Sequence, residues 1–153
     1  MNLKVSFTWI GLVIFALPML INIAYVVFPP AGNTEPAAAV PRWLELVEQF
    51  SRIAYLFAVT LLVSRDRLSF RSGWLYLAAL FLLLYCAVWI RYFAGGRAIA
   101  LLNRSFLLVP MPLAVFPVLY YLCAAIWLHN LPAAILMALF GAAHLAVSIL
   151  SFR

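Results

Sequence analysis

Long apolar segments alternate with short polar ones over the whole chain. A helix needs about 20 apolar residues to cross the hydrocarbon core of a bilayer. Five segments come close to that length, and turns rich in proline, glycine, asparagine or arginine separate them. They are residues 5–28, 43–64, 74–94, 106–128 and 133–152. The pattern predicts an all-α integral membrane protein, built as a compact bundle of five transmembrane helices.

The first segment, residues 5–28, contains no charged side chain. The apolar core of a signal peptide is only about 7–15 residues long, so we expect this segment to be a retained helix. Pro29 and Pro30 follow directly and should end it, because proline lacks the N–H that would continue the helix.

The segment 43–64 is the least regular of the five. Its uninterrupted apolar part, residues 53–63, measures only about 16 Å as a helix, roughly half of the hydrocarbon core. Either the segment does not span the bilayer, or it carries Glu45, Glu48 and Arg52 into the membrane.

The segment 106–128 contains Pro110, Pro112 and Pro117. Prolines are tolerated in membrane helices where neighbouring groups hydrogen-bond to the carbonyls that they leave free. We therefore expect this fourth helix to be kinked or partly broken.

Composition restricts the class of protein further. Of the 153 residues, 69% are hydrophobic and 9% are charged, whereas soluble domains have about 45–50% and about 25%. So few charged side chains cannot cover a soluble protein of this size. Cytosolic enzymes, secreted disulfide scaffolds and disordered regulators are therefore excluded, and residues 1–153 are interpreted as a single membrane domain.

The net charge of +6 does not indicate a nucleic-acid partner, because the basic residues are spread over turns and chain ends without forming a stripe. Nine of the ten are arginine. Arginine binds phosphate groups well, so membrane lipids are the expected partners.

The distribution of positive charge favours one orientation only weakly. With the N-terminus inside, Lys4, Arg65, Arg67 and Arg71 are cytoplasmic and five arginines lie outside. We expect this orientation because the densest cluster occupies a short loop and the first helix usually dominates. The near-balance also allows insertion in both directions and a homo-oligomer. Small size and scarce lysine favour a bacterial plasma membrane.

The segment 43–64 carries the most prominent polar face. Glu48, Arg52 and Tyr55 lie within about 60° of one another on a helix, and Glu45 lies beside them. Glu48 and Arg52 have the spacing and order of an ion pair. Ionisable groups in a membrane cost at least about 2.5–3.5 kcal/mol each, which makes these residues ligand-binding candidates. The alternative is an interfacial helix entry in which Arg52 reaches the headgroups.

Three further polar side chains interrupt apolar helices. His144 shares a helix face with Ser148, and histidine exchanges protons near neutral pH, so it is a candidate for a proton-sensitive ligand contact. The alternative is a hydrogen bond between helices. Asn22 and Tyr25 share a face of the first helix, where they serve either packing or ligand contact.

Three arginines, Arg91, Arg97 and Arg104, surround the Gly95–Gly96 turn. A helix starting at Phe106 would place backbone N–H groups near them, which is an arrangement that suits a phosphate or carboxylate. We regard the three arginines as candidates for binding an anion or a lipid headgroup. The alternative is a solvated loop.

Motifs for catalysis and cofactors are absent from the sequence: there is no HExxH, CxxC, GxSxG or P-loop. No metal ligand set and no cofactor is predicted. Glu48 and His144 could exchange a proton in principle, but nothing else indicates an enzyme, and no catalytic residue is assigned.

The sequence thus favours a protein that binds or transports a small amphiphile or organic ion in an intramembrane polar pocket, with the proline-containing helix as its moving part. One alternative is an accessory or structural subunit whose polar faces bind a partner membrane protein. Another is an intramembrane enzyme acting on a lipid or isoprenoid, which the lack of clustered carboxylates disfavours.

Overall fold

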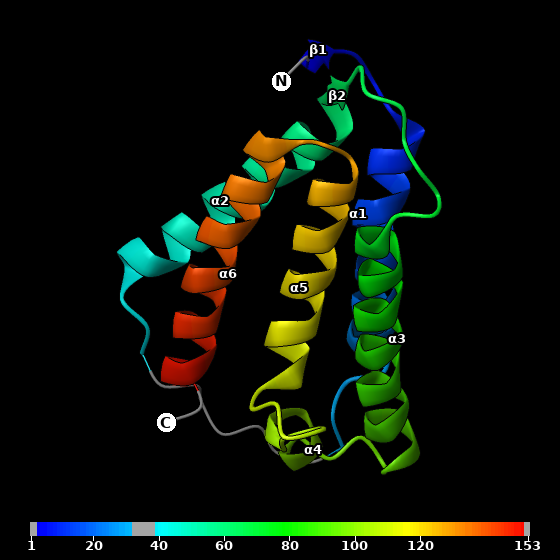
Figure 1. The fold of residues 1–153 in the computed structure, drawn as a ribbon. Coiled ribbons are helices and arrows are strands. Elements are labelled where there is room, and N and C mark those ends of the chain that lie inside the picture. Colours follow the sequence, from blue (N-terminus) through cyan, green and yellow to red (C-terminus); the bar gives the residue numbers. More distant parts are fainter. Residues whose placement is uncertain (1–2, 32–38, 152–153) are drawn as a thin grey trace.

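Figure 1 shows long helices that run side by side between two ends of the molecule. The computed structural model describes residues 3–31 and 39–151. The helices are α1 (Trp9–Val27), α2 (Arg42–Leu61), α3 (Gly73–Ala94), α4 (Ala100–Asn103), α5 (Pro112–Trp127) and α6 (Leu131–Ser151). Two short strands are β1 (Leu3–Val5) and β2 (Leu62–Ser64). The predicted helical class is confirmed.

Three helices of the described chain are long and apolar enough to cross a membrane: α1, α3 and α6. Helix α5 is apolar but shorter, with 16 residues. Helix α2 has 20 residues, and four of them are charged. The length and composition of α1, α3 and α6 support the predicted membrane class.

Helix α5 lies at the centre of the bundle. It packs against α3 on one side and α6 on the other, α2 packs against α6, and α1 packs against α2. A glycine allows the backbones of α1 and α2 to approach closely. A Cβ on Gly11 would lie only 1.9 Å from the carbonyl oxygen of Val59. α3 and α6 thus lie on opposite sides of α5, and α2 lies against α6 (Figure 1).

The ends of two predicted helices are strands instead. β1 and β2 pair antiparallel, with Leu3 opposite Ser64 and Val5 opposite Leu62. The predicted helical boundaries at Val5 and Ser64 therefore differ from the structure. Backbone groups at a helix end lack intrahelical partners, and pairing supplies partners to both segments at once.

Helix α5 begins at Pro112, although the sequence predicted a start at Phe106. Phe106 and Val109 instead form an isolated antiparallel bridge around a tight turn. Proline disfavours helical geometry in the residue before it, and Pro110 and Pro112 act on this segment in succession. Pro117 is the one proline inside α5.

A tyrosine on α5 hydrogen-bonds to the backbone oxygen that the proline inside α1 leaves without a helical partner. Pro18 has no N–H, so the carbonyl of Ile14, four residues earlier, loses its helical partner. The Tyr120 hydroxyl donates a hydrogen bond to that oxygen at 2.9 Å. The adjacent Tyr121 hydroxyl donates to the carbonyl oxygen of Phe15 at 2.8 Å. These two bonds attach α1 to α5.

Candidate functional site

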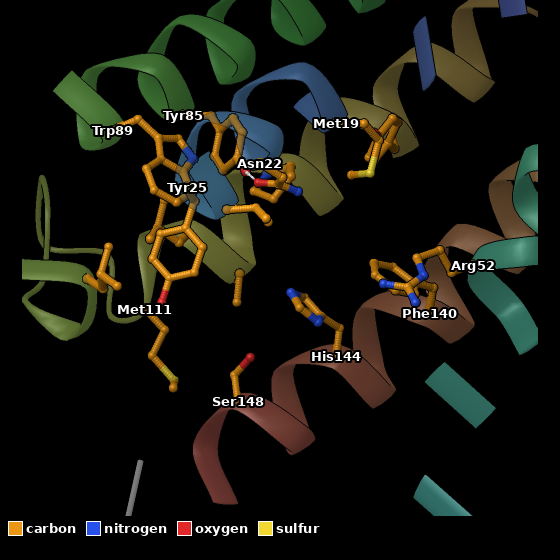
Figure 2. A pocket seen from close by; sticks show the side chains of 16 residues that line it. Met19, Asn22, Tyr25, Arg52, Tyr85, Trp89, Met111, Phe140, His144 and Ser148 are labelled. Atoms are coloured by element: carbon orange, nitrogen blue, oxygen red, sulfur yellow. Dashed lines mark hydrogen bonds between the residues drawn. The ribbon is translucent and has the colours of Figure 1, made fainter. Parts of the chain in front are cut away.

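A cavity of about 390 Å³ opens between α1 and α6, and residues of α5 contribute to its lining. Figure 2 shows its polar and aromatic side chains projecting from two sides. Asn22, Tyr25, Tyr85 and Trp89 come from α1 and α3, whereas Arg52, His144 and Ser148 come from α2 and α6. The volume lies within the range of roughly 300–1,000 Å³ that is usual for small-molecule pockets.

The most specific polar contact joins α2 and α6 at the edge of this cavity. His144 Nδ1 lies 2.9 Å from Glu48 Oε1. The two side chains are 28% and 15% exposed, respectively, so both are shielded from solvent. Where Nδ1 carries the proton that bonds to the carboxylate, Nε2 of the neutral ring is an acceptor, which can receive a hydrogen bond from a ligand. Figure 2 shows the imidazole extending from α6 into the cavity.

This contact corrects the ion pair that the sequence predicted. Glu48 and Arg52 have the spacing of a helical pair, but the Glu48 carboxylate bonds to His144 on α6. A bond to a neighbouring helix also connects α2 to the bundle, whereas a pair within α2 would not. Arg52 is exposed and lines the cavity, so its guanidinium remains at the opening.

On the opposite wall, the Tyr85 hydroxyl donates to Asn22 Oδ1 at 2.5 Å. This bond fixes the Asn22 side chain and joins α1 to α3. Figure 2 shows the Asn22 amide nitrogen on the side away from Tyr85. Asparagine has two amide donors in addition to its acceptor, so this nitrogen is available to an oxygen of a ligand.

Aromatic rings form the remainder of that wall. The ring centroids of Tyr25 and Trp89 are 5.5 Å apart, and Tyr85 meets Trp89 edge-on at 6.2 Å. Tyr92 packs edge-on against Trp89 at 5.5 Å and is fully buried. These rings support one another and give the cavity a rigid wall.

Four of the predicted ligand-binding residues line the cavity: Asn22, Tyr25, Arg52 and His144. Glu48 reaches the site through His144. The structure places the other two predicted residues elsewhere. Glu45 is exposed. Tyr55 is buried, and its hydroxyl donates to the carbonyl oxygen of Tyr121 at 3.0 Å, which gives it a structural contact.

The predicted anion site near Arg91 has a different local structure from the one expected. No helix starts at Phe106, so the expected backbone N–H groups are not arranged there. Arg91 donates instead to carbonyl oxygens, from Nη1 to Ser105 (3.1 Å) and from Nη2 to Leu101 and Arg104 (both 2.8 Å). Its guanidinium also lies 5.2 Å from the centre of the Phe106 ring. Arg91 thus holds the turn in place.

Arg104 is exposed and Arg97 is half-buried. Arg97 adopts a left-handed backbone conformation, with φ of 60°. Its carbonyl oxygen accepts a hydrogen bond from the Ala31 N–H at 3.2 Å, which connects the turn to the segment after α1. Contact of Arg97 and Arg104 with an anion or a lipid headgroup stays a prediction.

Sequence reasoning missed Tyr85 and Trp89. Aromatic residues recur throughout residues 74–94, so nothing in the sequence distinguishes these two from packing residues. Only the position of α3 against α1 and α5 identifies them. Within residues 3–31 and 39–151, no three histidine, cysteine or acidic side chains gather as a metal site.

The comparisons with known proteins add no assignment. No model of a protein family, no curated protein and no solved structure matches this chain.

Proposed function

We propose that this protein binds or transports a small amphiphile or organic ion in the cavity between α1 and α6. The observation that carries the proposal is the Glu48–His144 bond at the edge of a cavity lined by Arg52 and Asn22. Ionisable groups are costly in a membrane and are retained mainly where they bind or conduct something. Three helices, α1, α2 and α6, place these polar groups around one cavity, which a purely structural contact would not require.

The cavity is also mostly apolar, which suits an amphiphile. Met19, Val26, Leu113, Pro117 and Phe140 line it beside the polar groups. Pockets of this type bury the apolar part of a ligand, and a few polar groups fix its orientation.

We further propose a multi-pass arrangement with five spans, formed by α1, α2, α3, α5 and α6. Successive helices run in opposite directions, which supports this count, and α2 is inclined to its neighbours α5 and α6 (Figure 1). The pairing of β1 with β2 brings Lys4 to the end of the molecule where β2 leads into the Arg65–Arg71 loop. The shared location supports a cytoplasmic N-terminus. The bacterial plasma membrane is proposed from the small size and scarce lysine of the chain alone. Pro117 would be the kink and moving point of α5.

A cavity-blocking variant tests the binding function. Ser148 lines the cavity from α6, whereas the next residue, Ile149, is exposed. The probes are dodecanoate, dodecanol and dodecyltrimethylammonium, added to the full chain in phosphatidylcholine nanodiscs. We expect saturable binding of at least one probe to the wild type and to Ile149→Phe, and its loss in Ser148→Phe. Binding that is equal in all three proteins would contradict the proposal.

A second candidate function is an accessory subunit. Five large apolar side chains on the outer side of α2 are more than half exposed, with the alternating spacing of three and four residues that is typical of helix–helix contacts. These are Trp43, Leu46, Phe50, Ile53 and Phe57. A defined second membrane protein that co-purifies with the wild type but not with Phe50→Ser would favour this function.

A further inference from the structure

The charges around the cavity restrict the ligand that it can hold. Arg52 is the one permanently charged side chain in its lining, and no carboxylate lines it within the described residues. The nearest acidic side chain, Glu48, bonds to His144. Glu45 is exposed, and Asp66 accepts a hydrogen bond from Ser64 in the loop after β2. The lining of the cavity therefore contains the positive charge of Arg52 but no carboxylate.

The polar groups that face the cavity are mainly hydrogen-bond donors. Arginine has donors only, and the Asn22 acceptor already receives a hydrogen bond from Tyr85. Ser148 adds a hydroxyl next to His144, one helical turn further along α6. A set of donors on both walls is complementary to oxygen atoms that carry negative charge.

The alternative ligand is an organic cation, which would require an aromatic cage. Such a cage requires ring faces that are open to the ligand. Trp89 is instead packed edge-on by Tyr85 and Tyr92, and Tyr25 lies 5.5 Å from it. The rings contact one another, and a cation in the cavity would meet the like charge of Arg52.

We infer that the ligand is a single-chain amphiphile with an anionic oxygen headgroup, a carboxylate or a phosphate monoester. This inference rests on the proposed binding function and specifies the ligand class for the same cavity. The headgroup binds at Arg52, and the chain lies along Leu113 and Pro117 on α5. A volume of about 390 Å³ is near the lower limit for ligand pockets, which suits one chain and not a two-chain phospholipid.

The experiment compares headgroups on a constant twelve-carbon chain. Radiolabelled dodecanoate is bound to the full chain in phosphatidylcholine nanodiscs, and the signal from Ser148→Phe is subtracted as background. Dodecanoate, dodecyl phosphate, dodecanol and dodecyltrimethylammonium serve as unlabelled competitors at one pH. We expect the two anions to compete about tenfold or more better than the alcohol and the cation. Whichever anion competes better identifies the headgroup as a carboxylate or a phosphate.

Variants locate the selectivity at Arg52. Arg52→Gln should weaken anion binding about tenfold, which corresponds to about 1.4 kcal/mol, and should leave dodecanol nearly unaffected. Arg52→Lys keeps the charge and should retain most of the preference. Arg42→Gln is the matched control, since Arg42 is exposed at the start of the same helix and lies outside the cavity lining.

The outcomes separate this inference from the proposed function. Binding that is blocked in Ser148→Phe but is equal for all headgroups, or stronger for the cation, overturns the anionic ligand and leaves the binding function in place. Equal effects of Arg52→Gln and Arg42→Gln would also overturn it. If no probe binds in a manner that depends on Ser148, the proposed function fails and this inference fails with it. The competition between headgroups uses the wild type, so it is decisive even where Arg52→Gln does not fold.

Discussion

The Tyr120 hydroxyl on α5 donates to the backbone oxygen of Ile14 on α1, at 2.9 Å. That oxygen is the one that Pro18 deprives of its helical partner. The hydrogen bond therefore replaces, between two helices, a bond that is missing within one. In an apolar environment an unpaired carbonyl is costly, so the bond both permits the proline and attaches α1 to α5.

Removal of this hydroxyl should reduce stability in a way that depends on the proline. Tyr120→Phe leaves the Ile14 oxygen unpaired and should cost about 1–3 kcal/mol in the free energy of unfolding. In a Pro18→Ala background the restored N–H can bond to that oxygen, so the same substitution should cost less. Unfolding by increasing fractions of SDS in mixed micelles measures both costs. Equal costs in the two backgrounds would show that the two groups are not coupled.

Asn130 is a second connection that should be sensitive to substitution. It is 1% exposed, and its Nδ2 donates to the carbonyl oxygens of Ala58 (2.8 Å) and Leu62 (2.7 Å) at the end of α2. Its Oδ1 accepts from the Ala133 N–H at 3.1 Å in the first turn of α6. Asn130→Ala removes both contacts and should cost about 2–4 kcal/mol.

Asn130→Asp separates the two roles, because aspartate can still accept at the start of α6 but cannot donate to α2. Stability equal to the wild type would show that the donors to α2 contribute little. Leu131→Ala is the control, since that side chain is 55% exposed. The same SDS titration applies to all three variants.

The contact between α1 and α2 requires a glycine. A Cβ at Gly11 would lie 1.9 Å from Val59 O, and a backbone atom cannot move aside as the end of a side chain can. Gly11→Ala should therefore separate the helices and cost about 1–3 kcal/mol. Gly73→Ala is the matched control, because a Cβ at Gly73 meets nothing within 4 Å. Similar melting temperatures for the two variants would contradict this reason for the glycine.

The site was predictable from the sequence where polar side chains interrupt apolar segments. Asn22, Arg52 and His144 were identified in this way, and all three line the cavity. Tyr85 and Trp89 were missed because an aromatic residue in an apolar helix carries no such contrast. Glu45 has the same contrast but is exposed, since it lies in the first turn of α2.

Hydropathy along the chain determined the helical membrane class and the approximate extent of the long helices, because each helical hydrogen bond connects residues only four apart. The tertiary structure decided the partners of the polar groups. Glu48 bonds to a histidine 96 residues away instead of to Arg52 in the next turn. Residues at the ends of two predicted helices pair as strands. The choice between a local and a distant partner depends on how the helices pack, and spacing within one helix contains no information about its neighbours.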